Sequence, residues 1–431
     1  MLKRFLVHGR ARGERGQALI LFVGIATVIF LVAAIVVDFG IWFSERQGAH
    51  KDADASTLAG AQELLKQDFV NVGTNNCSIT QAAAENAALD WAQRNGLPPA
   101  DVHNLTVAPT NCLGPTNCLG PGPTGVLDSV ALDAEHHSRA LFSGIFGLAA
   151  PQIGAHARAC LGSIVSAEGL LPVGIQISGF QSNCWRDVNG DGQPDPLYGQ
   201  ECTLTFGGGD FTSGEGGALN LYNNGSLNCS GNNTGGGRTY RDELSAGGAA
   251  TTCFVLPVGE TCSTFPQGCV WPQTGNLVGQ ERVGFSNLIS GEGRCDALYG
   301  SPPDGIDDFN EVVDLVSGGP GPSPRTVYAE RDCDPVLANL QRSPRLVSLI
   351  IIDQFTAQGN PPKPILAFAS FYIKQCESPD VPPRVSKTCD FRAIGNPGHV
   401  IVRGQFVNIL VTNGMVGGIS KWSPKRIILK E

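Results

Sequence analysis

The sequence predicts an α+β protein that begins with a membrane-spanning helix, and three observations lead to this fold class. An uncharged apolar segment of membrane length stands near the N-terminus, at residues 18–37. Gly and Pro are frequent, at 55 and 28 of 431 residues, whereas charged residues make up 16%, which is typical of a loop-rich, β-rich body. All 14 cysteines lie beyond Asn76, so disulfide bonds are expected to stabilise that body.

The apolar segment is predicted to be a single-pass anchor with its N-terminus inside the cell. Residues 18–37 are long enough to cross the ~30 Å hydrocarbon layer. Five basic residues lie in the tail of residues 1–17, whereas charges of both signs follow from Asp38 onward. The positive-inside rule then places the tail in the cytoplasm and the body outside the cytoplasmic membrane. A cleaved secretory signal is the alternative, but its apolar core would be shorter, about 7–15 residues.

The anchor is expected to continue as an extracytoplasmic helical stalk over residues 38–70. No proline precedes Pro98, so nothing in the sequence interrupts the helix. Small residues recur along the stalk and would let a helix of a partner protein approach closely. These residues are Ala49, Ala53, Gly60 and Ala61. The alternative is a solvated stalk in which alanine serves helix propensity alone.

Two units of different composition follow the stalk. Residues 71–165 are predicted to form a small α+β unit, in which residues 80–94 have the composition of a helix and Gly96 can end it. Residues 166–345 are rich in Gly and Cys and poor in apolar residues. Each disulfide in this region would contribute about 2–4 kcal/mol by restricting the unfolded chain. Connectivity cannot be derived from the sequence, and scattered buried thiols are the alternative.

The C-terminal region, residues 346–431, is predicted to be β-rich. Three long stretches are rich in β-branched and aromatic residues, and we expect each to form a strand. These stretches are "PRLVSLIIIDQF", "KPILAFASFYIKQ" and "HVIVRGQFVNILVTN". The closing "SPKRIILKE", residues 423–431, is expected to be a solvated basic tail.

Several classes of function lack support in the sequence. The net charge of -9 disfavours nucleic-acid binding. No zinc-type Cys or Cys/His spacing occurs, and neither a nucleophile elbow nor a phosphate-binding loop is present. The histidines show no convergence on a common site. We therefore expect no catalytic residues, no enzyme activity and no small-molecule substrate.

One local motif has the pattern of a calcium loop. In "DVNGDGQPD", oxygen-bearing side chains alternate around Gly192, which permits a tight turn. These side chains are Asp187, Asn189, Asp191 and Asp195. Tyr198 stands where an EF-hand loop has its bidentate Glu, so a weak extracellular site with affinity of ~10⁻⁴–10⁻³ M and a turn without metal both stay open. Calcium is the only cofactor that the sequence predicts.

A second acidic turn, "PPDGIDDFNE" at residues 302–311, contains Asp304, Asp307 and Asp308. It is predicted to be the capped start of a helix rather than a second cation site.

The N-terminal residues resemble a known family. "RGQALILF", an apolar span, "VVDFGIWFSERQ" and "KDADASTLAGAQEL" occur in the order found in TadG-like proteins of tight-adherence (Flp) pilus-assembly systems. The matching positions are Arg15, Gly16, Gln17, Ala18, Asp38, Gly40, Asp52, Ala53, Asp54, Ala55, Leu58, Ala59, Gly60 and Ala61. The resemblance is strong over about the first 65 residues.

The resemblance implies a non-catalytic protein anchored in the bacterial cytoplasmic membrane, which assists assembly or anchoring of a tight-adherence pilus. Its partners would be other pilus-assembly or pseudopilin-like membrane proteins. The alternative is a membrane-tethered, calcium-dependent adhesin or ligand-binding surface module.

Overall fold

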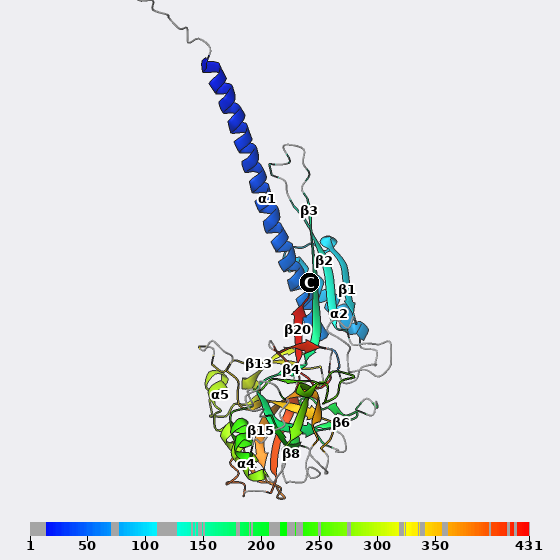
Figure 1. The fold of residues 1–431 in the computed structure, drawn as a ribbon, viewed down its shortest axis with the longest axis vertical. Helices are drawn as coiled ribbons and strands as arrows, with labels where there is room; N and C mark the ends of the chain where they lie inside the picture. Colours follow the sequence, from blue (N-terminus) through cyan, green and yellow to red (C-terminus); the bar gives the residue numbers. More distant parts are fainter. Residues whose placement is uncertain are drawn as a thin grey trace, which may run out of the picture.

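The structure is a computed structural model, and Figure 1 shows an elongated molecule with one long helix projecting from it. It describes residues 14–69, 77–109, 127–138, 141–142, 144, 149, 151–177, 182–188, 190, 193–206, 216–221, 229, 236–248, 251–273, 277–318, 323, 325–334, 336, 341–355, 361–395, 398–411, 414–417 and 420–430. The α+β class and the long N-terminal helix confirm the predicted fold class.

The projecting helix, α1, is unbroken from Glu14 to Leu64. Its 51 residues extend about 76 Å at ~1.5 Å per residue. Side chains of residues 19–37 are exposed or half-exposed, and Asp38 is the first buried residue. From Ala49 onward one side of the helix enters the core of the body. The prediction that one helix joins the apolar segment to the stalk is therefore confirmed.

The C-terminal part of α1 packs on a small α+β unit. Helix α2 (Cys77–Arg94) and strands β1 (Val102–Ala108), β2 (Ser129–His137) and β3 (Gln152–Ile164) form this unit. The strands pair antiparallel in the order β1-β2-β3. Their alternating inner side chains share one apolar core with α1 and α2. Helix α2 confirms the helix predicted for residues 80–94.

The end of the chain completes the same sheet. Strand β20 (Lys425–Leu429) pairs antiparallel with β3, and the sheet continues through β18 (Ile409–Leu410), β13 (Val327–Glu330) and β12 (Val313–Ser317). Lys425 is fully buried, and its Nζ donates to the carbonyl oxygens of Ser420 and Ser423 at 2.8 and 2.6 Å. The expectation of a solvated basic tail is therefore wrong. The backbone groups of long strand β3 need a partner beyond β2, and the tail supplies it.

The distal body is built around a closed ring of six strands. In order around the ring these are β15 (Lys363–Glu377), β14 (Leu346–Ile352), β5 (Leu170–Gln176), β9 (Gly216–Asn220), β8 (Cys202–Phe206) and β17 (Val400–Val407), and β17 pairs with β15 to close it. Alternate residues of each strand point inward, as Val347, Leu349 and Ile351 do in β14. The three C-terminal strands predicted from the sequence are thus confirmed as β14, β15 and β17.

Shorter elements complete the body. They are η1 (Pro99–Asp101), β4 (Ser166–Ala167), β6 (Trp185–Arg186), β7 (Asp195–Pro196), α3 (Gly237–Ser245), β10 (Cys253–Phe254), η3 (Pro266–Gly268), β11 (Cys269–Pro272), α4 (Val278–Ile289), α5 (Arg294–Tyr299), α6 (Phe309–Val312), β12 (Val313–Ser317), β13 (Val327–Glu330), β16 (Val385–Ser386), β18 (Ile409–Leu410) and β19 (Val416–Gly417). Helices α3 and α4 pack against each other and add Tyr240, Leu244 and Phe285 to the core of the ring.

Within the described part of the chain, five disulfides with both cysteines described join neighbouring parts of the body. They are Cys184–Cys202, Cys229–Cys253, Cys262–Cys269, Cys295–Cys333 and Cys376–Cys389, and Cys160 is disulfide-bonded as well. The expected pairing of the cysteines is therefore confirmed. Regions 166–345 and 346–431 contribute strands to the same ring, so the Gly-rich middle of the chain has a share in a common core.

Gly60 marks a close approach of α1 to the body. A Cβ at this position would lie 3.0 Å from the carbonyl oxygen of Ala84 and 3.0 Å from Cγ1 of Val130. We predict that Gly60→Leu lowers the free energy of unfolding by about 1–3 kcal/mol or more, because overpacking forces α1 away from α2 and β2. Thermal unfolding of the purified protein in detergent measures this effect. Gly48→Leu is the matched control in the same helix, since a Cβ there meets nothing within 4 Å; equal destabilisation by both changes would contradict the prediction.

Glu281 places a titratable group inside the distal core. It is 1% exposed, accepts a hydrogen bond from the hydroxyl of Tyr240 at 3.3 Å, and burial raises its pKa from 4.5 to about 7. The protonated form is thus favoured by folding. Its contribution to stability is complete below pH ~4.5, falls as the pH rises through ~7, and is absent above that.

We therefore predict that Glu281→Gln, which cannot ionise, is as stable as the wild type near pH 4.5. At pH 8 the variant should be more stable by up to about 3 kcal/mol, at about 1.4 kcal/mol per pKa unit. Denaturant unfolding at both pH values measures the difference, with the exposed Glu260→Gln as control. A stability difference that is the same at both pH values would refute the assignment.

Candidate membrane anchor and contact sites

The N-terminal part of α1 is a candidate membrane span. Among the described residues, Leu19–Leu64 is the one helix long and apolar enough to cross a bilayer. The apolar part of this helix buries none of its residues within the protein. Ile20 and Phe30 are both 74% exposed, which is unfavourable in water and suited to lipid.

The body first meets α1 at Asp38. The carboxylate is fully buried and accepts backbone N–H groups from the chain between β2 and β3. Leu141 donates to Oδ1 at 3.3 Å, and Phe142 donates to Oδ1 and Oδ2 at 3.2 Å. An ionised carboxylate that accepts several N–H groups makes charge-assisted hydrogen bonds, which are stronger than neutral ones. Asp38 therefore fixes the β2–β3 connection to the end of the apolar span.

The small residues of α1 contact the chain's own body. Ala49, Ala53 and Ala61 are fully buried, and Gly60 lies against α2 and β2. The close helix approach that these residues allow is thus made with α2 of the same chain. Contact between these four residues and a separate protein stays a prediction, because a single chain does not test it.

The residues directly after the C-terminal end of α1 make polar contacts with the sheet. Gln67 donates to the carbonyl oxygen of Leu127 at 2.7 Å and accepts the N–H of the same residue at 2.9 Å. The Nζ of Lys425 lies 4.8 Å from the ring centre of Phe69. The end of α1, the start of β2 and the C-terminal strand therefore meet at one place, which the sequence did not indicate.

Four histidines lie beside carboxylates on the same unit. His136 is 3.4 Å from Asp52 of α1, so this pair joins the helix to β2. The other pairs are His103–Glu135 at 3.4 Å, His137–Asp101 at 3.6 Å and His156–Asp133 at 2.6 Å. Hydrogen bonds from Asn104 and His156 lower the pKa of Asp133. These pairs could not be read from the sequence, because register across β1, β2 and β3 sets the His103–Glu135 and His156–Asp133 pairs.

The acidic loop after β6 has partners within the body. Asp187 accepts the N–H of Gly190 at 2.7 Å. Asp195 is fully buried, accepts the N–H of Val188 at 2.9 Å and forms an ion pair with Lys421. Asn189, Asp191 and Gly192 lie outside the described residues, and the described residues contain no cluster of three or more metal-ligating side chains. Calcium binding by Asp187, Asn189, Asp191 and Asp195 stays a prediction.

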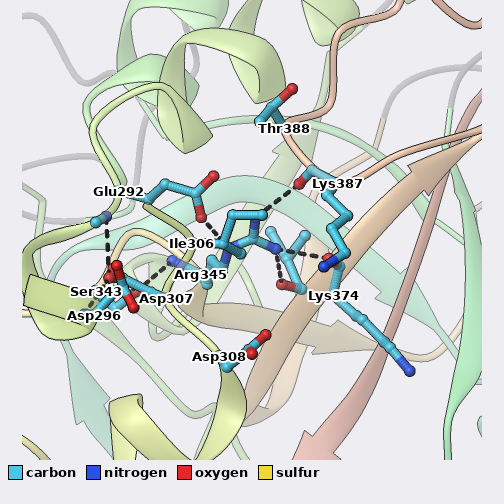
Figure 2. A network of polar contacts seen from close by, with 12 residues as sticks. Glu292, Asp296, Ile306, Asp307, Asp308, Ser343, Arg345, Lys374, Lys387 and Thr388 are labelled. Carbon is cyan, nitrogen blue, oxygen red and sulfur yellow. Dashed lines mark hydrogen bonds and ion pairs between the residues drawn. The ribbon is translucent and has the colours of Figure 1, made fainter. Parts of the chain in front are cut away.

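A buried polar network holds the distal loops together, and Figure 2 shows it from close by. Arg345 is fully buried and forms an ion pair with Glu292. Its other guanidinium nitrogens donate to the carbonyl oxygens of Ile373, Lys374 and Lys387 at 2.7–3.0 Å. With these donors satisfied, the charge is compensated, and the arrangement joins loops that lie far apart in the sequence.

The second acidic turn belongs to this network. Asp307 accepts the N–H groups of Gly293 and Asp296 at 3.0 Å and the hydroxyl of Ser343 at 2.7 Å. Asp308 and Glu311 form a capping box at the start of α6. The prediction of a capped helix start for residues 302–311 is confirmed.

Comparisons with known proteins point to the N-terminal segment. Residues 16–63 match the family model described as putative Flp pilus-assembly TadE/G-like. No curated protein and no solved structure matches the chain. The matched residues coincide with α1, from the start of its exposed apolar part to the end of its buried part. Over residues 16–63 the chain is therefore similar to the TadE/G-like Flp pilus-assembly family.

Proposed function

We propose that the protein is a non-catalytic, single-pass envelope protein that assists assembly or anchoring of a tight-adherence pilus. One observation carries the proposal: α1 is a single helix whose first part faces outward with apolar side chains and whose last part is buried in the body. The family match over residues 16–63 covers both parts. The segment of pilus-assembly type is therefore the connection between membrane and body.

The mechanism is rigid coupling. An unbroken helix has no hinge between its apolar part and its packed part, so movement or tilt of one part is transmitted to the other. Near the junction, a Cβ at Gly40 or Gly48 would meet nothing within 4 Å. The connection therefore depends on helix stiffness there more than on packing.

The proposed orientation of the chain in the membrane is supported by the charges before the apolar segment and by the disulfides of the body. Five basic residues precede the apolar segment, which favours an N-terminus in the cytoplasm. The five described disulfides are in the body, and disulfides persist in oxidising compartments. Both arguments support a body outside the cytoplasmic membrane.

We expect other pilus-assembly membrane proteins to contact surfaces that are exposed to solvent in the single chain. The apolar residues of α1 before Asp38 are exposed along their length. Ala49, Ala53 and Ala61 would have to leave the core before they could meet a partner. Partner helices are therefore expected to pack within the bilayer, beside the span.

Stiffness of α1 can be tested at Gly48. We predict that Gly48→Pro greatly reduces pilus assembly, because proline removes a helix hydrogen bond and clashes with the preceding turn, at a cost of about 3 kcal/mol or more. Gly48→Ala is the matched control, since it keeps the helix and fits the open space. Pili are counted by electron microscopy, with membrane fractionation to confirm insertion of both variants. Normal assembly with the proline variant would favour the alternative of a tethered adhesin without a pilus role.

Topology can be tested by thiol labelling of the full chain. We predict that a membrane-impermeant reductant and maleimide label the body cysteines while the cytoplasmic membrane is closed. Leu2→Cys provides an internal control, which should react only after lysis. Mass spectrometry of the labelled peptides assigns each site, and labelling of the body only after lysis would reverse the proposed orientation.

A further inference from the structure

An exposed apolar pair lies beside the end of the proposed membrane span. Leu141 and Phe142 are 56% and 42% exposed. Their backbone N–H groups are the ones that Asp38 accepts, at 3.2–3.3 Å. The hydrogen bonds therefore fix both residues next to α1 while leaving their side chains open.

Their level relative to the bilayer follows from the sequence of α1. Residues 18–37 carry no charge and Asp38 follows directly. At ~1.5 Å per residue these 20 positions extend about 30 Å, which matches the hydrocarbon thickness. Asp38 thus stands at the outer edge of the hydrocarbon. Because Leu141 and Phe142 bond to its carboxylate, they stand at the same level.

The adjoining turn of α1 has the composition of a membrane interface. Phe39 and Phe43 are 62% and 64% exposed. Trp42 lies between them in the sequence, with its ring centre 5.2 Å from that of Phe39. Aromatic side chains are favoured at the boundary between acyl chains and headgroups. Phe39, Trp42 and Phe43 lie within five residues of Asp38 along α1, so these rings and the apolar pair stand near one level of the helix, directly after its exposed apolar residues 19–37.

We propose that Leu141 and Phe142 are a second membrane contact, which inserts into the interfacial layer of the bilayer that α1 crosses, and that Asp38 positions them there. The occupant of this surface is lipid, because the surface continues the lipid-facing side of α1 at the same depth. The inference rests on the proposed membrane crossing by α1. Two contacts, unlike one helix alone, restrict tilt of the body relative to the bilayer.

Photocrosslinking of the full chain tests the contact. Benzoylphenylalanine replaces Phe142 in protein reconstituted into vesicles of phosphatidylethanolamine and phosphatidylglycerol, and lipid adducts are measured by mass spectrometry. Phe30→benzoylphenylalanine, within the span, is the positive control. Val381→benzoylphenylalanine is the control for exposed apolar residues, since Val381 is 98% exposed and comes four residues after the end of β15, a strand that lies in the distal body, away from the projecting part of α1 (Figure 1).

We expect lipid adducts at positions 142 and 30 and none above background at 381. Adducts at 30 without adducts at 142 would overturn the second contact and leave the anchor intact. Absence of adducts at both positions would overturn the membrane crossing itself. In native membranes, crosslinking of position 142 to a protein in place of lipid would also overturn the proposal, because the surface would then be a partner site.

The role of Asp38 is tested in the same assay. Asp38→Ala removes the acceptors of both N–H groups, and we expect adducts at position 142 to fall about tenfold, while adducts at position 30 stay constant. Asp38→Asn retains one acceptor oxygen and should restore part of the signal. Both variants are checked for intact disulfides, which show that the body is folded. Unchanged adducts at position 142 in Asp38→Ala would refute the positioning role.

Discussion

The packing of α1 against α2 and the first sheet is the constraint on which the rest of the structure depends. An outward-facing apolar helix and a folded body can act as one unit only if the helix enters the core of that body. Small residues make this possible. At Gly60 the backbone of α1 comes so close to α2 that a Cβ at this position would lie 3.0 Å from the carbonyl oxygen of Ala84. The family match ends at residue 63, where this packed part of α1 also ends. The matched segment is thus the whole connecting device, including the part within the body.

Strand β3 carries the connection from α1 to the distal ring. One edge of β3 pairs with β2, beneath α1, and the other with the C-terminal strand β20. Its last residue, Ile164, belongs to the same core as Leu170 of β5, the first strand of the ring in the sequence. The N-terminal helix, the chain end and the ring are therefore linked through backbone pairing and shared apolar contacts. The disulfides and the Arg345 network stabilise the distal body, where Gly-rich loops have little apolar surface of their own.

The features that could be predicted from the sequence rest on local signals. The length of the apolar segment predicts the candidate span, β-branched and aromatic composition predicts β14, β15 and β17, and the number and position of the cysteines predict the disulfides. What could not be predicted depends on pairing between distant residues. Lys425 reads as part of a polar tail until β3 is seen to need a partner. In the sequence, Asp38 is recognisable only as the end of an apolar run. Its hydrogen-bond partners, Leu141 and Phe142, could not be predicted because they are more than a hundred residues away.

The contacts of Asp38 give a physical reason for an Asp directly after the apolar run. A carboxylate at the lipid boundary is costly to bury unless its oxygens are hydrogen-bonded. Here the backbone N–H groups of Leu141 and Phe142 supply those bonds, so the carboxylate that ends the apolar run also fixes these two residues of the body beside it. Further along, Ala49 begins the buried side of α1. The helix is therefore held at Asp38 and again from Ala49 onward, and contacts at two heights determine its tilt relative to the body as well as its attachment.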